Sequence, residues 1–234
     1  MAIEILRKQP LTFYTQNGIN FFKPFRAVDK NKNPLELSWN HKPDFSSITA
    51  KSKYNDDISI YNIKIDKSKN DFKGDSIVTT PKNKGIGEVL NLASIITFKE
   101  NNFVDYSVFA LRNAIQFYAK YGFNLLSSNF NEIMHNLKFL TKLKDERYID
   151  TRESAKFLIN KVQQAPNDAE KIKYIPTANN LVSDYIRNLA REGEKIDGDD
   201  LYNHTHMHFS TIDTIRNRDY LNELFDKHEI DYKI

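Results

Sequence analysis

Hydrophobic and polar residues alternate with a period of two over much of residues 1–80, which is the pattern of half-buried strands. Residues 11–15 and 19–22 are two such runs. The Asn17-Gly18 pair between them accommodates positive φ, so the pattern predicts a β-hairpin. A further alternating run at residues 35–39 predicts another strand.

Isoleucines recur at strand-like spacing over residues 58–65, and the alternation slips at Tyr61-Asn62. A slip of this kind indicates a β-bulge, in which one extra residue is inserted into a ladder. Residues 67–74 are polar and predict a turn, which leads to a short strand at residues 77–80.

The spacing of apolar residues changes from two to that of a helix at Ile86. One buried stripe is formed by Ile86, Val89, Leu90, Ala93 and Ile96, and this helix is expected to end near residues 99–102. Residues 103–109 then predict a strand and residues 111–121 a helix, which Gly122 ends. Alternating strands and helices predict a mixed sheet with helices packed on it.

Three amphipathic helices are predicted after residue 126, and their apolar stripes are packing faces. The stripes are Phe130, Ile133, Met134, Leu137 and Leu140; Ala155, Leu158, Ile159 and Val162; and Leu181, Val182, Tyr185, Ile186 and Leu189. Pro166 and Pro176 are placed in the connections, and residues 202–212 and 229–234 are expected to supply late strands. We therefore expect a core at residues 1–128 and a helical elaboration at residues 129–234.

Composition narrows the function classes. The chain has 234 residues, of which 40% are hydrophobic, so it can bury a sizeable core. The net charge of +3 does not by itself indicate a nucleic-acid partner. The absence of cysteine excludes disulfides, thiolate metal sites and a cysteine nucleophile. No apolar run approaches the ~20 residues of a membrane span, and the first residues lack a signal-peptide pattern, so a cytoplasmic protein is expected.

The candidate chemistry lies in the glycine-containing stretch before the helix at Ile86. Gly85 and Gly87 let backbone N–H groups face an anion, and the helix dipole favours a phosphate there. Lys82 and Lys84 add positive charge at the same place. Leu90 stands where a dinucleotide fingerprint needs Gly or Ala, and the P-loop motif is absent. A pair of glycines alone is more often a tight turn than a phosphate site.

Two motifs, at residues 82–87 and 114–123, resemble those of the GNAT superfamily of N-acetyltransferases. The first is similar to its Gln/Arg-x-x-Gly-x-Gly/Ala pyrophosphate loop, and the second to its Ala-x-x-Phe/Leu-Tyr-x-Lys-x-Gly-Phe signature. The resemblance covers residues 58–125. Lys82 replaces the usual Gln or Arg, and Leu111 stands where the family often has Asn, with Asn113 close by.

The resemblance implies a GNAT-like α/β fold with a mixed, mostly antiparallel central sheet flanked by helices. It also implies acetyl transfer from acetyl-CoA to a primary amine, with Tyr118 as the acid that protonates the cofactor sulfur. Asp105 and Tyr106 become candidates to contact the acceptor amine. The cofactor-binding residues that it implies are Ile77, Val78, Thr79, Lys82, Asn83, Lys84, Gly85, Ile86, Gly87, Glu88 and Asn113.

Several alternatives stay open. Tyr118 also fits a core aromatic residue, and the two lysines fit ordinary surface positions. The acceptor amine belongs to a small molecule, a protein or an aminoacyl-tRNA, and a homodimer is compatible with the resemblance. A second function class is a non-catalytic module that binds CoA or acyl-CoA, or another protein, on the same fold.

Histidines alternate in the stretch His204-Thr205-His206-Met207-His208, so on a strand the imidazoles share one face. Such a face can hold a metal, but no carboxylate stands at a diagnostic spacing. We therefore expect hydrogen-bonded histidines and no metal, with a general base near the acceptor as the functional alternative.

Overall fold

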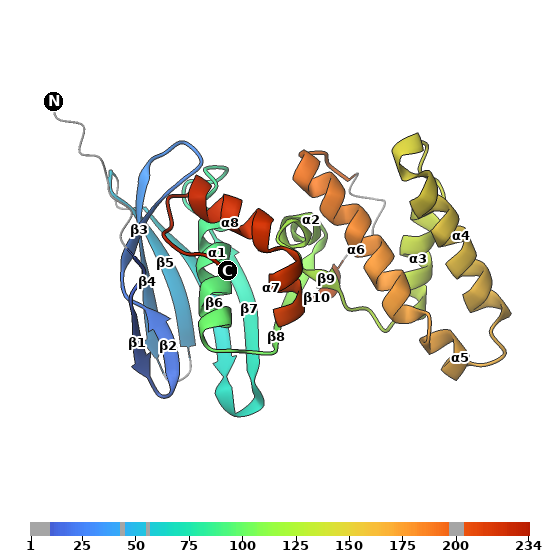
Figure 1. Cartoon of the computed structure of the whole chain (residues 1–234), viewed down its shortest axis with the longest axis horizontal. Helices are drawn as coiled ribbons and strands as arrows, with labels where there is room; N and C mark the ends of the chain where they lie inside the picture. The colour runs from blue at the N-terminus through green and yellow to red at the C-terminus, as the bar shows by residue number, and fades with distance from the viewer. Residues whose placement is uncertain (1–9, 43–44, 55–56, 197–203) are drawn as a thin grey trace. The chain divides into compact units, whose positions relative to one another are not determined.

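The computed structural model describes residues 10–42, 45–54, 57–196 and 204–234. The chain divides into two compact units, and each is described here by itself (Figure 1). Unit 1 comprises residues 1–106 and 210–234, and unit 2 comprises residues 107–209. The expected division at residue 128 is drawn where the amphipathic helices begin, and it stays a prediction.

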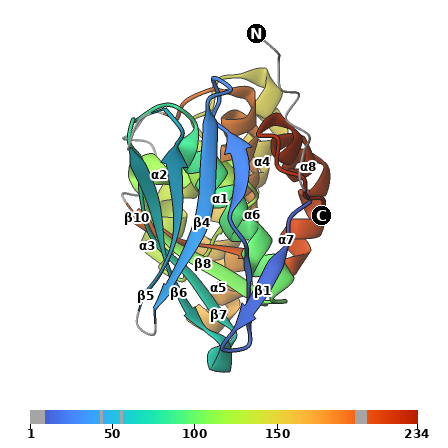
Figure 2. The same cartoon turned by 90° about the vertical axis from the view of Figure 1, so that its left-hand side faces the viewer.

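Unit 1 is built on antiparallel strands. Its strands are β1 (Phe13–Gln16), β2 (Ile19–Phe22), β3 (Phe25–Val28), β4 (Pro34–Lys42), β5 (Phe45–Ser52), β6 (Ile58–Asp66) and β7 (Asp71–Val78). The first two form a hairpin, and β3-β4-β5-β6-β7 follow one another in a sheet (Figure 2). Neighbours along the chain are therefore neighbours in the sheet.

The predicted hairpin is confirmed, because Asn17 and Gly18 adopt φ values of 53° and 72° between β1 and β2. The predicted bulge is also present, at Asn62/Ile63 in the ladder with β7. The polar turn is shorter than predicted: a 3-10 turn occupies Lys67–Lys69 and β7 already begins at Asp71. The reason is that Ile65 and Lys64 pair with Phe72 and Lys73, which extends the ladder into the polar stretch.

Helix α1 (Ile86–Glu100) is the central element of unit 1 and is buried along almost its whole length. It contacts β2, β5, β6 and β7. Polar side chains on it have partners in the core: the Ser94 hydroxyl lies 2.9 Å from the Tyr106 hydroxyl, which also bonds that of Tyr61. The indole of Trp39 donates to Thr97 Oγ1 at 3.1 Å. These bonds fix the rotation of α1 against the sheet.

Two helices complete unit 1: α7 (Thr211–Arg216), which begins with a capping box of Ser210 and Asp213, and α8 (Arg218–Lys227). The prediction of a strand at residues 229–234 is wrong. Backbone N–H groups there are directed at α8 instead, since Ile230 donates to the Phe225 carbonyl and Ile234 to the Asn222 side chain.

Unit 2 combines short strands with helices. Its elements are β8 (Asp105–Leu111, which begins in unit 1), α2 (Arg112–Lys120), β9 (Asn124–Leu125), α3 (Phe130–Leu140), a 3-10 turn (Glu146–Tyr148), α4 (Ile149–Gln164), α5 (Asp168–Ile172), α6 (Ile175–Glu192) and β10 (His204–Ser210). The strands run in the order β8-β10-β9, and β9 pairs antiparallel with β10. Helix α6 contacts α2, α3, α4 and β9.

The three predicted amphipathic helices are α3, α4 and α6, and the late strand at residues 202–212 is β10. Pro176 does not lie in a connection as predicted. It occupies the first turn of α6, where proline is tolerated because that N–H has no partner within the helix. The expected mixed α/β class with mostly antiparallel strands and flanking helices is confirmed, and the family-specific arrangement stays a prediction. Among the described residues, no helix is long and apolar enough to cross a bilayer.

Candidate functional site

The glycine-containing stretch forms the connection between β7 and α1 in unit 1. Ser59 supports its start, because its hydroxyl accepts from the Thr80 N–H at 2.9 Å. Asn83 and Gly85 both adopt left-handed backbone conformations, with φ values of 62° and 78°. Gly85 is the N-cap of α1, and a Cβ at this position would lie 3.1 Å from the Lys30 Cβ. A side chain there would be strained by the backbone conformation and would press against Lys30.

The start of α1 offers backbone donors. The N–H groups of Glu88 and Val89 both reach the Gly85 carbonyl, at 3.1 and 3.3 Å. No side chain caps the helix, and within the described part of the chain no acceptor is found for the N–H groups of Ile86 and Gly87. Unpaired N–H groups at a helix N-terminus are suited to an anion, which the helix dipole also favours.

Two lysines, Lys82 and Lys84, precede these donors in the chain. Lys82 is exposed and Lys84 half-buried, and the Lys84 carbonyl accepts from the Lys30 N–H at 3.0 Å. The turn that carries Lys30 is organised by Asp29, whose carboxylate accepts from the N–H groups of Asn31 and Asn33 at 2.7 and 2.9 Å. Burial acts to raise the pKa of Asp29, but the hydrogen bonds from Asn33 and Asn31 and the charge of Lys84 outweigh it and leave the pKa below its usual value.

Glu88, one of the predicted cofactor contacts, is directed into unit 1. Its Oε1 accepts from Lys227 Nζ at 2.6 Å and lies 2.7 Å from Nε2 of His228. The other imidazole nitrogen of His228 lies 2.6 Å from the Val28 carbonyl oxygen. Sequence reasoning missed His228, since it stands 140 residues from Glu88 and no local pattern connects them.

Tyr118 and Asn113, the other predicted site residues, belong to α2 in unit 2. Tyr118 is only 7% exposed, and its ring contacts those of Phe117 and Phe123 with centroids 5.1 and 5.3 Å apart. The Asn113 side chain lies outside the described part of the structure. The predicted loop residues thus lie together in unit 1, whereas Tyr118 and Asn113 belong to unit 2.

Ile77 and Val78 are the last residues of β7, and Thr79 follows them into the loop; Val78 is 59% exposed. Asp105 and Tyr106 were candidates to meet an acceptor. Tyr106 is fully buried and its hydroxyl takes part in the core hydrogen bonds with Tyr61 and Ser94. A structural role therefore accounts for Tyr106.

The histidine stretch forms β10 with the predicted alternation. Thr205 and Met207 are buried, His206 is exposed, and the His206 ring contacts that of Phe109 at 4.9 Å. The His204 side chain lies outside the described residues. Among those described, no group of three metal-ligating side chains comes together, and the expectation of no metal stays a prediction.

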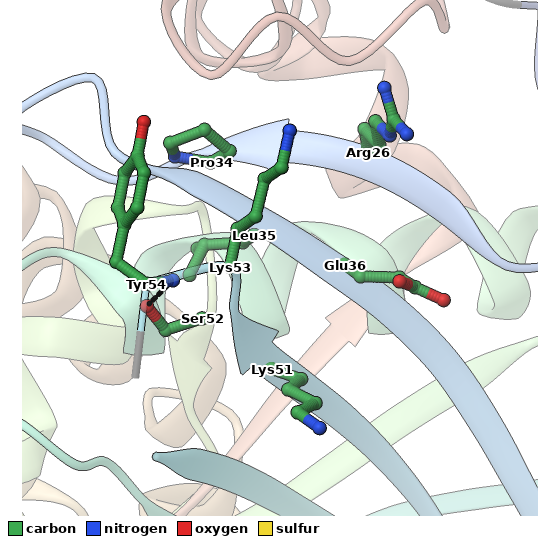
Figure 3. Close-up of a pocket in the computed structure, with 8 residues that line it drawn as sticks. All are labelled: Arg26, Pro34, Leu35, Glu36, Lys51, Ser52, Lys53 and Tyr54. Carbon is green, nitrogen blue, oxygen red and sulfur yellow. Dashed lines mark hydrogen bonds between the residues drawn. The ribbon is translucent and has the colours of Figure 1, made fainter. Parts of the chain in front are cut away.

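A pocket of about 350 Å³ lies where β4 begins and β5 ends in unit 1 (Figure 3). Arg26, Lys51, Lys53 and the exposed Tyr54 line it together with Glu36. The charged ends of Arg26 and Lys51 point to different sides of the pocket in Figure 3, so these cations do not converge on one anion. None of its lining residues belongs to the glycine-containing loop.

Comparisons with known proteins give little further information. No family model and no curated protein matches this sequence. Among solved structures, the chain is similar to nourseothricin acetyltransferase, with a TM-score of 0.33 and 14% identity over 51% of this chain and 86% of that one. This neighbour is, by its name, an acetyltransferase.

Proposed function

We propose that this chain is an N-acetyltransferase that moves an acetyl group from acetyl-CoA to a primary amine. One observation carries the proposal: among the described residues, the N–H groups of Ile86 and Gly87 at the start of α1 have no acceptor, and Lys82 and Lys84 stand close by in the sequence. This geometry occurs where the sequence resembles a pyrophosphate loop, and the second signature follows in the expected order.

In the proposed reaction, the CoA pyrophosphate accepts hydrogen bonds from these two N–H groups. Gly87 leaves room for its approach, and the two lysines neutralise part of its charge. The backbone of residues 77–79 is proposed to run beside the pantetheine arm and to polarise the acetyl carbonyl. Glu88 supports the loop from behind, because its carboxylate is directed at Lys227 and His228.

The chemical step is direct transfer. The neutral amine nitrogen forms a bond to the acetyl carbon, and the carbon–sulfur bond then breaks with both electrons going to sulfur. A base or water chain takes the proton lost by the amine, and Tyr118 is the proposed donor of a proton or hydrogen bond to the thiolate. The acceptor is a small amine, a protein or an aminoacyl-tRNA.

The test is a search for CoA species in the purified protein by mass spectrometry, followed by turnover of labelled acetyl-CoA with a panel of amines. Co-purified CoA and labelled product on at least one amine are the expected results. Bound CoA without turnover on any small amine, protein or aminoacyl-tRNA would favour the non-catalytic binding module. Absence of any CoA binding would contradict both.

A further inference from the structure

Three segments that are far apart in the sequence are joined at the start of α1. The Lys30 N–H bonds the Lys84 carbonyl at 3.0 Å, which links the turn after β3 to the loop. The Val28 N–H bonds the His228 carbonyl at 3.0 Å, which links β3 to the segment after α8. His228 in turn reaches Glu88, in the first turn of α1, at 2.7 Å. The three contacts close a ring around the base of the loop.

The side chain of His228 contacts both β3 and α1. The side chain is fully buried, and its Nδ1 faces the Val28 carbonyl, which can only accept. Its Nε2 faces Glu88 Oε1, which already accepts from Lys227 Nζ at 2.6 Å. Each ring nitrogen thus lies at hydrogen-bond distance from a fixed oxygen, Nδ1 from a backbone carbonyl of β3 and Nε2 from a carboxylate of α1. A buried side chain that bonds in two directions at fixed angles holds both of its partners in place.

We infer that His228 is a positioning residue for the loop, and that docking of residues 227–230 controls how well the loop binds the CoA pyrophosphate. The N–H groups of Ile86 and Gly87 belong to the same helical turn as Glu88, so a bond at Glu88 fixes their direction. Lys32 Nζ adds a bond from the β3–β4 turn to the Lys227 carbonyl at 2.8 Å. By reciprocity, a bound anion stabilises the docked segment.

This inference rests on the proposed function, so its test has one measurement with CoA and one without ligand. His228→Gln places an amide nitrogen near the position of Nε2 and retains the bond to Glu88. His228→Asn places one near Nδ1 and retains only the bond to Val28. The two variants are equally neutral and similarly polar, so they differ mainly in which of the two contacts survives.

Without ligand, hydrogen exchange of the amides at residues 84–90 is expected to accelerate roughly tenfold or more in His228→Asn, while His228→Gln stays near wild type. With CoA, calorimetry is expected to show that His228→Asn lowers the CoA affinity about tenfold, while His228→Gln leaves it near the wild-type value. Glu88→Gln breaks the ion pair from the α1 side and replaces His228→Asn if that variant fails to fold.

Equal exchange and equal CoA affinity in both folded variants would overturn the positioning role. Equal losses in both would do so as well, since they would indicate a general packing role for the side chain. If wild-type protein does not bind CoA, the proposed function fails, and the exchange measurement alone then decides whether His228 holds the loop.

Discussion

Single side chains near the loop have charges that the structure explains, and Asp29 is the clearest of them. Its folded pKa lies below the usual value because hydrogen bonds and Lys84 outweigh the effect of burial. A carboxyl group with a lowered pKa stabilises the fold above its unfolded pKa of about 4, and this stabilisation is lost as the pH falls through the folded pKa. The turn that carries Lys30 therefore depends on an ionised Asp29.

We predict that Asp29→Ala lowers the free energy of unfolding at neutral pH by about 1–3 kcal/mol, because two backbone N–H groups and the Asn33 amide lose their acceptor. Urea unfolding of both proteins at several pH values measures this. The difference should shrink as the pH falls below about 4 and on through the lower folded pKa, where the wild-type carboxyl becomes protonated. The exposed Asp75→Ala serves as control, and a pH-independent difference for Asp29→Ala would refute the account.

Tyr118→Phe tests the proposed acid. Removing only the hydroxyl should lower kcat by a factor within or just below about 10²–10⁴, with little change in CoA affinity or melting temperature. Tyr148→Phe is a matched control, because Tyr148 is also a buried tyrosine of unit 2 and its hydroxyl donates to Glu192 at 3.4 Å. A wild-type kcat in the Tyr118 variant would assign that residue a packing role alone.

Helix α1 carries a buried polar side chain, that of Asn91. Asn91 is fully buried, and among the residues that the structure describes neither polar atom of its side chain has a hydrogen-bond partner. Burying an amide without partners is costly. We predict that Asn91→Leu, of similar shape, raises the free energy of unfolding by about 1–3 kcal/mol.

The control for this prediction lies one turn further along α1. Ser94 is equally buried, but its hydroxyl bonds the Asn91 carbonyl and the Tyr106 hydroxyl, so Ser94→Ala should destabilise the protein. Chemical denaturation of both variants gives the comparison. A loss of stability in Asn91→Leu would mean that the amide has a partner such as a buried water.

Elements with a clear local signal could be predicted from the sequence. The hairpin follows from Asn17-Gly18, and α1 and α2 follow from apolar spacing and from Gly122. Strand β5 was missed because its stretch Phe45–Ser52 contains polar Ser46 and Ser47, which are nevertheless buried in the sheet. Burial of a polar residue depends on its neighbours in space, which a local pattern does not contain.

At the scale of the whole molecule, unit 1 is formed by two separate stretches of chain, residues 1–106 and 210–234. The loop residues could be proposed as a candidate site from the sequence because glycines and lysines lie beside one another in it. The contact between Glu88 and His228 could not, since it joins those two stretches. The residue types of a loop can therefore be recognised in one short stretch of sequence. The contacts that hold the loop in place depend on segments that are distant in the sequence.

The central claim is that the loop at the start of α1 binds the CoA pyrophosphate. Gly87 is the position at which to test it, since it lies inside the helix and lacks the positive φ that makes any substitution at Gly85 strained. Calorimetric titration of CoA into the wild type and into Gly87→Glu measures the CoA affinity of each and tests the claim directly. The melting temperature is the control for folding. The account predicts binding to wild type and none to the folded variant, because the added carboxylate repels and obstructs the pyrophosphate. Equal CoA affinity in both proteins, or no binding to wild type, would contradict it.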